Sequence, residues 1–394
     1  MDKGRLKMNK NLVLYLLAFC VFVMASVEIV VAGILGMIAQ DTNVSVGMAG
    51  QLVTVYAIVI AAGSPILLSL TSRMERKNLL LLTFFVFVIG NLLAFFSPNF
   101  TILMVSRIVQ AASAGVFTVV ALTVGASIAA PERRGSAIGI IITGASTALV
   151  VGVPLGTLIG EYWGWRLVFM CINILALFSI IGIAASVPKM ESQESVSLKT
   201  QLAVLRDRRI ISGLFITFFW VIGYQLLFTY ISPFLQEAAS LTTTQISAAL
   251  FICGIFAVIG SRIGGYGADR WGIYRTLLVS LLLHAVSLAA LPWVGITFIG
   301  AIVILAVWIG SAYMTTPAQQ YYLVSLSPNS SGLVLSLNNS VLQLGIAIGA
   351  GAGGWVVNQT SVMNLGWIGA ISIVIGMFTV FYSFSLKSKS LKEA

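Results

Sequence analysis

Glu28 is an acidic residue inside a long apolar run that extends from Leu12 to Ala39. About 20 apolar residues suffice for a helix to cross the hydrocarbon layer of a membrane. A carboxylate at that depth costs about 3 kcal/mol or more unless it is protonated, paired or in contact with water. The other eleven acids of the chain fall in loops or at the ends of apolar segments. We therefore predict a proton or cation site at Glu28, with a structural hydrogen bond between helices as the alternative.

Arg107 is the second charge placed deep in an apolar segment. It lies roughly two turns from the end of its segment, and Glu28 lies about three turns from the same side. Similar depths favour an interaction in which Arg107 tunes the affinity of Glu28 for a proton. In the alternative, Arg107 only hydrogen-bonds carbonyls of a neighbouring helix. Gln110 and Thr118 follow on the same helical face and are predicted to face the cavity and contact a solute.

The composition indicates a chain that crosses a membrane many times. Its 394 residues are 59% hydrophobic and 9% charged, and the mean hydropathy is +1.02. A soluble domain of this size needs far more charge on its surface. With one histidine, and with three cysteines in apolar runs, we expect no metal site. No nucleophile elbow or phosphate-binding loop is visible, so we expect neither an enzyme nor a bound cofactor.

Twelve apolar segments follow one another, and the chain is predicted to be an all-α membrane protein. Two six-helix bundles, 1–187 and 210–394, are separated by a polar linker at 188–209. The approximate spans are 12–39, 48–70, 78–97, 100–129, 136–160, 167–187, 210–235, 244–266, 276–294, 297–325, 332–357 and 362–385.

Basic residues predict the orientation. Of the 22 Lys and Arg residues, 19 lie on one side of the predicted spans, Arg166 lies on the other, and Arg107 and Arg262 fall in apolar segments. This asymmetry predicts that both termini are cytoplasmic. The net charge of +10 thus reflects the orientation of the chain in the membrane, and the basic residues are also expected to contact membrane lipid. Nucleic acid is not an expected partner.

An internal repeat relates the two halves with an offset of 197 residues. Gly152 and Gly156 of the fifth segment match Gly349 and Gly353 of the eleventh. This agreement indicates a duplicated six-helix unit in parallel orientation. Small residues at a spacing of four let helix backbones approach closely. We expect these stripes to form close, sliding contacts between the halves.

Several motifs of the chain resemble those of the major facilitator superfamily. Residues 265–272, GYGADRWG, look like that family's cytoplasmic loop motif, and 68–77, LSLTSRMERK, resemble a first copy in which Ser72 replaces its aspartate. Residues 103–110, LMVSRIVQ, resemble the fourth-helix motif of proton-coupled members, and 152–156, GVPLG, resemble the antiporter motif that marks exporters. The resemblance implies the twelve-helix fold and a set of gating residues. These are Arg73, Glu75, Arg76, Gly152, Pro154, Gly156, Asp269 and Arg270.

Within that family the chain looks like the drug–proton antiporter branch and is most similar to bacterial purine base and nucleoside efflux pumps. The resemblance implies efflux driven by the proton gradient, across the inner membrane of a bacterium, by a chain that works as a monomer. Sugar, chloramphenicol and multidrug exporters of the same family are the alternatives for the solute. A channel or a transport-fold sensor is the alternative from another class, although no filter-like loop is visible.

The repeat also suggests where a neutral solute binds. The offset maps Glu28 onto Gln225 and Arg107 onto Ile304, so the second half has an amide where the first has an acid. We infer that the proton is handled by the first half and the solute mainly by the second. Stacking faces and amides suit a planar, hydrogen-bonding solute, although aromatic residues also serve simply as packing. The predicted solute-binding residues of the second half are Tyr224, Gln225, Phe228, Trp308, Asn338, Asn339 and Gln343.

Two further polar residues in apolar segments are predicted to be structural. His284 falls in the ninth segment, which the resemblance places as an outer scaffold helix. Arg262 lies near the end of the eighth segment and is expected to reach the interface or to pair near Asp269.

Overall fold

The computed structural model describes residues 10–130, 133–190, 207–327 and 331–386. In this part of the chain, twelve helical spans are long and apolar enough to cross a membrane. Each predicted apolar segment corresponds to one of them. The prediction of an all-α membrane protein with twelve spans is therefore confirmed.

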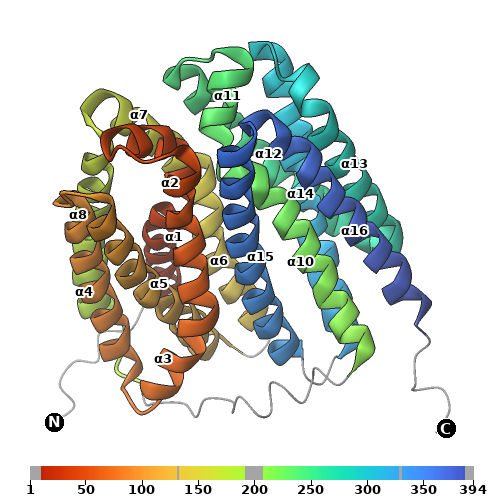
Figure 1. Cartoon of the computed structure of the whole chain (residues 1–394). Coiled ribbons are helices and arrows are strands. Elements are labelled where there is room, and N and C mark those ends of the chain that lie inside the picture. Colours follow the sequence, from red (N-terminus) through yellow and green to blue (C-terminus); the bar gives the residue numbers. More distant parts are fainter. Residues whose placement is uncertain (1–9, 131–132, 191–206, 328–330, 387–394) are drawn as a thin grey trace, which may run out of the picture. The chain divides into compact units, whose positions relative to one another are not determined.

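In the described residues, the first six spans contain ten helical elements, because the second and fifth spans are interrupted (Figure 1). The unbroken spans are α1 (Lys10–Asp41), α4 (Arg76–Phe95), α5 (Phe100–Ile128) and α8 (Trp165–Ser186). The second span consists of α2 (Val46–Ile58), η1 (Val59–Gly63) and α3 (Ser64–Leu70). The fifth consists of α6 (Arg134–Thr147), η3 (Ala148–Gly152) and α7 (Val153–Trp163).

The last six spans are mostly single helices. They are α10 (Arg208–Phe228), α12 (Thr243–Arg270), α13 (Ile273–Val294), α14 (Phe298–Leu326), α15 (Ser331–Gln359) and α16 (Leu365–Ser385), with the 3-10 turn η5 (Val362–Asn364) before the last. The short helix α11 (Ile231–Ala239) lies between α10 and α12. The seventh span is shorter than predicted, because α10 ends at Phe228 and a turn at Thr229 and Tyr230 precedes α11.

The described residues divide into two compact units. One holds the residues up to Val44 and those from Val55 to the gap at 191–206, and the other holds Ser45–Thr54 and the residues after that gap. The predicted linker, 188–209, lies for the most part outside the described residues. The division passes through α2, so its first part groups with the helices of the second unit.

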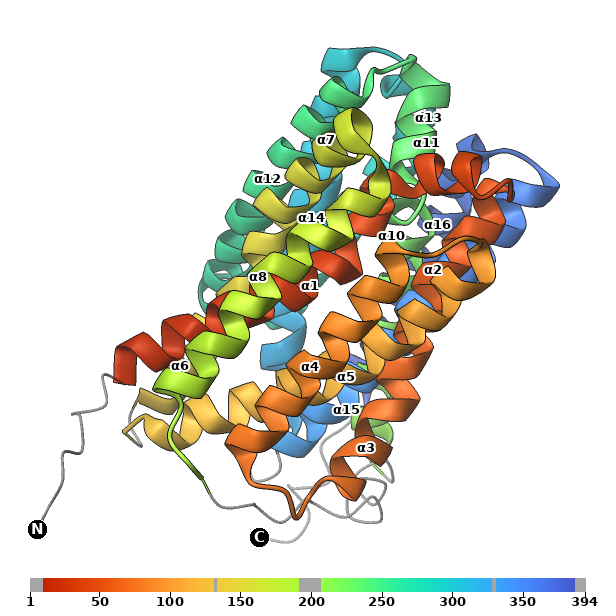
Figure 2. The ribbon, with the colours of Figure 1, turned by 90° about the vertical axis from the view of Figure 1, so that its left-hand side faces the viewer.

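The same neighbour relations recur in both units, as a duplicated bundle requires. In the first unit, α1 contacts α8, all three elements of the fifth span and α5, while α4 contacts α5 and α8. Figure 2 shows α4 and α5 lying side by side, as these contacts require. In the second unit, α10 contacts α16, α15 and α14, while α13 contacts α14 and α16. Span by span, these are equivalent pairs, which supports the predicted repeat.

The glycine stripes pack inside each unit, and their predicted role between the halves is wrong. A Cβ at Gly152 would meet the hydroxyl of Ser26, and one at Gly156 would meet Val30, both on α1. In the second unit, Gly349 and Gly353 face α10 in the same way. Their physical role is the one predicted, because a missing side chain lets two backbones approach. The neighbour that approaches belongs to the same bundle.

Two prolines of the first unit follow π-helical segments. The segment η1 ends at Gly63, two residues before Pro65, and η3 ends at Gly152, two residues before Pro154. A proline has no N–H to donate to the preceding turn, and the helix accommodates the loss by locally wider winding. The sequence Gly-x-Pro is the common signal of both interruptions.

Two glycines of the segment Ser45–Thr54, which groups with the second unit, pack closely against other residues of that unit. A Cβ at Gly50 would collide with the hydroxyl of Tyr230, and one at Gly47 would collide with the backbone of Gly354 on α15. The Tyr230 hydroxyl donates a hydrogen bond of 2.7 Å to the carbonyl of Ala350. Burial raises the pKa of the Tyr230 phenol, so the hydroxyl stays protonated and keeps this bond.

The glycine packing is testable with two alanine substitutions in α6. At Gly144 the new methyl group would collide with the carbonyl oxygen of Ala18, whereas at Gly139 nothing lies within 4 Å. We expect Gly144→Ala to lower stability by about 1–3 kcal/mol through overpacking. Gly139→Ala should be neutral or stabilise by up to about 1 kcal/mol, since alanine favours a helix. Thermal unfolding of both variants in detergent measures the difference, and equal melting temperatures would contradict the close packing of α1 on α6.

Candidate functional site

Arg107 lies at the centre of the first unit and is completely buried. Its guanidinium donates from Nη1 to the backbone carbonyl of Val27 on α1 at 3.0 Å and to Oε1 of Gln110 at 2.9 Å. It also lies over the ring of Tyr56 on α2, with 4.2 Å between the guanidinium carbon and the ring centroid. A cation over an aromatic face gains about 2 kcal/mol or more when desolvated. Three spans therefore meet at one charge.

Gln110 connects this charge to a fourth span. Its amide nitrogen donates to the carbonyl of Gly90 at 3.3 Å and to Oδ1 of Asn91 at 3.1 Å, both on α4. Asn91 in turn donates to the carbonyl of Phe87. Because Gln110 is 0% exposed, its contacts are with the protein, and its predicted contact with a solute has no support in this geometry. Thr118, a few turns along, is partly buried and donates to the carbonyl of Ala114.

Glu28 is partly buried, which distinguishes it from Arg107. It interacts electrostatically with both Arg107 and Tyr56. The structure thus brings the two charges together in one unit, as their depths in the sequence predict. Arg107 also makes the carbonyl bond of the structural alternative. Its effect on the affinity of Glu28 for a proton stays a prediction.

This arrangement suits reversible protonation of a carboxyl group. The positive charge is fixed by backbone and amide acceptors, so it stays in place when the charge of the neighbouring acid changes. Glu28 is only partly buried, and a group that takes up and releases protons must be accessible. A buried charge and a more accessible acid next to it are typical of functional sites within membrane spans.

An aromatic cluster occupies the second unit. Tyr224 on α10 lies nearly parallel to Phe228, with ring centroids 5.1 Å apart at 17°, and to Trp308 on α14, at 5.3 Å and 30°. The indole nitrogen of Trp308 donates to Nε2 of His284 on α13 at 2.9 Å. Phe228, Trp308 and His284 are 2%, 0% and 0% exposed, whereas Tyr224 is partly accessible.

Two of the predicted amides of the second unit have hydrogen-bond partners on neighbouring threonines. Gln225 is buried and donates to Oγ1 of Thr229 at 2.9 Å, so it is less accessible than Glu28, its counterpart in the repeat. Asn338 is buried and accepts from Thr217 at 2.6 Å. Gln343 is buried and Asn339 is exposed. These contacts do not test whether the amides bind a solute, so their roles in solute binding stay predictions.

The sequence interpretation missed two residues of this unit, Gln319 and Tyr313. Gln319 on α14 donates to the carbonyl of Gly213 at 2.6 Å and to Thr217 at 3.1 Å, and so joins α14 to α10. Tyr313 contacts Tyr224, with ring centroids 6.4 Å apart at 78°. His284 was predicted to be structural, and its bond to Trp308 shows what it supports. A buried indole needs a hydrogen-bond acceptor. The single histidine among apolar residues was therefore the sequence feature that could have indicated a partner for Trp308.

The family of the chain follows from comparisons with known proteins. The family model described as Major Facilitator Superfamily matches residues 17–350. The chain belongs to the major facilitator superfamily. Over 98% of its length it is 38% identical to the MFS-type transporter YbcL of Bacillus subtilis, covering 99% of that protein. It is 32% identical to the inner membrane transport protein YdhP of Escherichia coli K12, over 95% of this chain and 97% of the relative.

Solved structures share the superfamily fold. A bacterial homologue of the human lysosomal transporter Spinster, in an inward-facing and occupied conformation, superposes with a TM-score of 0.77. It is 14% identical, and the match covers 97% of this chain and 98% of that one. The human organic anion transporter MFSD10 has a TM-score of 0.70 at 14% identity, covering 94% and 99%. At this identity the likeness concerns the fold. Membership of a transporter superfamily supports a transporter rather than an enzyme.

The superfamily motif of residues 265–272 is mostly helical, where a loop was predicted. Helix α12 continues to Arg270, and Gly272, with φ of +87°, starts the turn into α13. A positive φ is easy for glycine and strained for other residues. Asp269, Arg270 and Arg262 are all exposed, and the guanidinium of Arg270 lies 6.0 Å from the ring centroid of Tyr266.

The first copy of the motif is tied to the end of α8. The backbone N–H of Arg76 donates to the carbonyl of Met190 at 3.1 Å, and Nζ of Lys77 donates to the carbonyl of Ala184 at 2.7 Å. Glu75 accepts from the amide of Asn78 at 3.0 Å, and Arg73 is exposed. These contacts all lie within the first unit. The predicted gating roles of Arg73, Glu75, Arg76, Asp269 and Arg270 are not tested by them.

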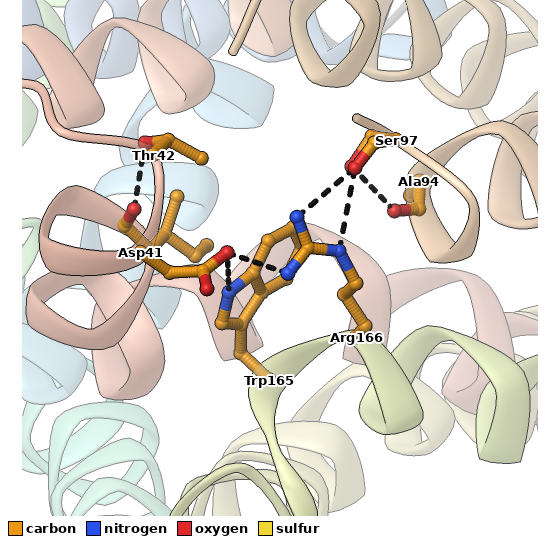
Figure 3. Close-up of polar contacts among 7 residues, drawn as sticks. Asp41, Thr42, Ala94, Ser97, Trp165 and Arg166 are labelled. Carbon is orange, nitrogen blue, oxygen red and sulfur yellow. Dashed lines mark hydrogen bonds and ion pairs between the residues drawn. The ribbon is translucent and has the colours of Figure 1, made fainter. Parts of the chain in front are cut away.

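Arg166 closes the opposite end of the first unit (Figure 3). It pairs with Asp41 at the end of α1, and its Nε and Nη2 donate to the carbonyl of Ser97 at 3.3 and 3.0 Å. The indole of Trp165 also donates to Asp41, at 3.2 Å. The basic residue that stands alone on this side thus joins the ends of α1 and α4 to the start of α8.

Replacing Arg107 by lysine tests its role in joining four spans. A lysine keeps the charge but lacks the planar fork that reaches several acceptors at once. We expect Arg107→Lys to lower stability by about 1–3 kcal/mol, because buried acceptors lose their donors. The matched control is Arg166→Lys, whose ion pair is partly exposed and should cost at most about 1 kcal/mol. Equal melting temperatures in detergent would show that the Arg107 contacts are dispensable.

Proposed function

We propose that this member of the superfamily exports a small, neutral, planar solute in exchange for protons. The observation that carries the proposal is the electrostatic interaction, within one unit, between a partly accessible Glu28 and the fully buried Arg107. The resemblance to antiporter motifs at 103–110 and 152–156 supports efflux. The drive is the proton gradient, and no cofactor is required.

Alternating protonation of Glu28 provides the coupling. When the carboxyl group faces the side with more protons, it takes one up, and its attraction to Arg107 is lost. The neutral side chain crosses the occluded state at lower cost than an ionised one. On the other side the proton is released and the carboxylate returns to Arg107. The acceptors at Val27 and Gln110 hold the guanidinium through both steps.

The available energy is sufficient for a useful gradient. One proton moving through 100 mV supplies about 2.3 kcal/mol. This corresponds to roughly a fifty-fold concentration ratio for a neutral solute. One protonatable acid per transport cycle therefore meets the energetic requirement of the proposal.

Purine bases or nucleosides are the proposed solutes. The accessible Tyr224 with its parallel neighbours supports a planar ring system that also forms hydrogen bonds. Sugar, chloramphenicol and multidrug export remain alternatives within the superfamily. A channel or a sensor built on the same fold would give a flux or a signal that does not depend on a pH gradient.

The proposed orientation places both termini in the cytoplasm of a bacterium, with the chain as a monomer in the inner membrane. Reporter fusions after Lys199 and after Ala394 should both give cytoplasmic signals, because 19 of the 22 basic residues lie on that side. Fusions near Asp41 and Arg166 serve as the opposite controls. A periplasmic signal from either of the first two fusions contradicts the orientation.

The coupling is tested with inverted membrane vesicles that contain the protein. A labelled panel of purines, nucleosides, sugars and chloramphenicol identifies the solute that the wild type accumulates under an imposed pH gradient. Glu28→Gln mimics the permanently protonated acid. We expect this variant to bind and exchange that solute but to accumulate it no more than a vesicle without a gradient does, a loss of up to about fifty-fold.

Glu161→Gln is the matched control, because it removes an exposed acid from α7 of the same unit. It should accumulate the solute as the wild type does. Glu28→Asp should retain partial coupling with a shifted pH optimum. Full uphill transport by Glu28→Gln would exclude Glu28 as the essential proton carrier and direct attention to Asp41 and Glu75.

A further inference from the structure

A hollow lies at the end of the second unit where the turn between α12 and α13 meets the last turns of α14 and α16. Its volume is about 470 Å³, which falls in the range of small-molecule sites, roughly 300–1,000 Å³. Its lining includes Trp271, Tyr274, Arg275, Tyr321 and Phe384. Because these residues lie next to the ends of membrane spans, the hollow is at the depth of the membrane interface.

Aromatic rings form much of the wall of this hollow. The ring of Tyr274 lies 5.1 Å from that of Phe384, at 56°. Phe384 in turn stacks on the buried Tyr322, at 4.4 Å and 16°, and the Tyr322 hydroxyl shares a hydrogen bond of 2.7 Å with Ser383. The wall is therefore anchored to the interior of the unit. Aromatic residues with a polar edge are typical of the membrane–water interface.

The polar groups of the hollow suit an anion with several oxygens. Arg275 and Tyr321 are exposed, and within the described residues no hydrogen bond or ion pair engages the guanidinium or the phenol. A guanidinium has five donors and a phenol has one. The described lining contains one cation and no acid. A planar guanidinium matches the geometry of a phosphate group.

An apolar surface continues from the hollow along α16. The ring of Tyr274 contacts Phe381, with centroids 6.3 Å apart at 70°. Phe381 and Phe378 are 45% and 66% exposed, and at a spacing of three they are neighbours on the helix surface. On a spanning helix such side chains meet acyl chains. A ligand with a phosphate in the hollow and apolar chains along α16 therefore uses both surfaces, whereas a free phosphate uses only the first.

We propose that this hollow binds the head group of an anionic phospholipid. Arg275 and Tyr321 donate to the phosphate, and the acyl chains follow Phe381 and Phe378. Basic pockets at the ends of spans attract anionic head groups. A zwitterionic head group fits less well, because its ammonium group meets no carboxylate in the described lining. The site is separate from the proposed transport cycle and depends on neither its solute nor its drive.

Titration of the delipidated full-length protein with phosphatidylglycerol, followed by native mass spectrometry, tests the charge. We expect Arg275→Gln to raise the dissociation constant about fivefold, the usual share of one basic residue in binding an anionic lipid. The matched control is Arg133→Gln, the same change at an exposed arginine of the first unit, which should bind like the wild type. A rise of less than twofold, or an equal rise in both variants, overturns the proposal.

The same titration tests the phenol. Tyr321→Phe keeps the ring and removes the donor, so the dissociation constant should rise about fivefold, the value of one hydrogen bond. Tyr382→Phe is the control, because Tyr382 is an exposed tyrosine near the same end of α16 that does not line the hollow. Equal affinities of these two variants would refute the contact of Tyr321 with the phosphate.

Two further ligands separate a lipid from other anions. Phosphatidylethanolamine, which is zwitterionic, should bind at least about fivefold more weakly than phosphatidylglycerol, and equal binding overturns the preference for negative charge. Glycerol 3-phosphate has the phosphate without acyl chains and should not displace the lipid at equal concentration. Displacement would identify a site for soluble anions and overturn the lipid assignment.

A chain that ends at Leu386 tests the segment 387–394 as the alternative occupant. We expect its affinity for phosphatidylglycerol to equal that of the full chain or to fall, since the segment contains three lysines. Binding that becomes about fivefold tighter would assign the hollow to this segment instead of a lipid.

Discussion

A positive charge buried among apolar helices is the constraint on which the first unit depends. Arg107 is 0% exposed, and an uncompensated ion in such surroundings costs several kcal/mol. The compensation comes from a backbone carbonyl of α1, a ring of α2 and an amide of α5 that is itself fixed by α4. Moving any one of these spans by itself disturbs the charge. The interaction therefore makes this part of the unit rigid and places Glu28 beside a fixed positive field.

Both units solve the same packing problem and then differ in chemistry. Each has its glycine stripe against its first helix, at equivalent spans, because two backbones can approach only where a side chain is missing. Onto this common frame the first unit adds an acid and a buried arginine, and the second adds an aromatic cluster with a histidine. The close packing leaves the polar residues free to diverge between the two units.

The residues of the two candidate sites differ in burial. Arg107, Gln110, Trp308 and His284 are fully buried and hold their neighbours in place, whereas Glu28, Tyr224 and Tyr313 keep partial access. In a transporter the accessible groups must change partners during the cycle, and their supports must not. The hydrogen bonds to Val27, Gly90 and His284 fix these supports, so they are as important to the proposed function as the accessible groups are.

Hydropathy by itself determined the twelve spans and the all-α membrane class, because a membrane admits few structures other than helices with saturated backbones. The superfamily fold was predicted from the motifs. The depths of Glu28 and Arg107 and the repeat could also be predicted, since they depend on counting residues along regular helices. The tertiary structure decided which side chains meet. Helical spacing does not tell which neighbour a glycine stripe faces, whether Trp308 is covered, or that His284 reaches its indole, because these depend on the rotation of one helix against another. The π-helical interruptions before Pro65 and Pro154 alter that rotation locally.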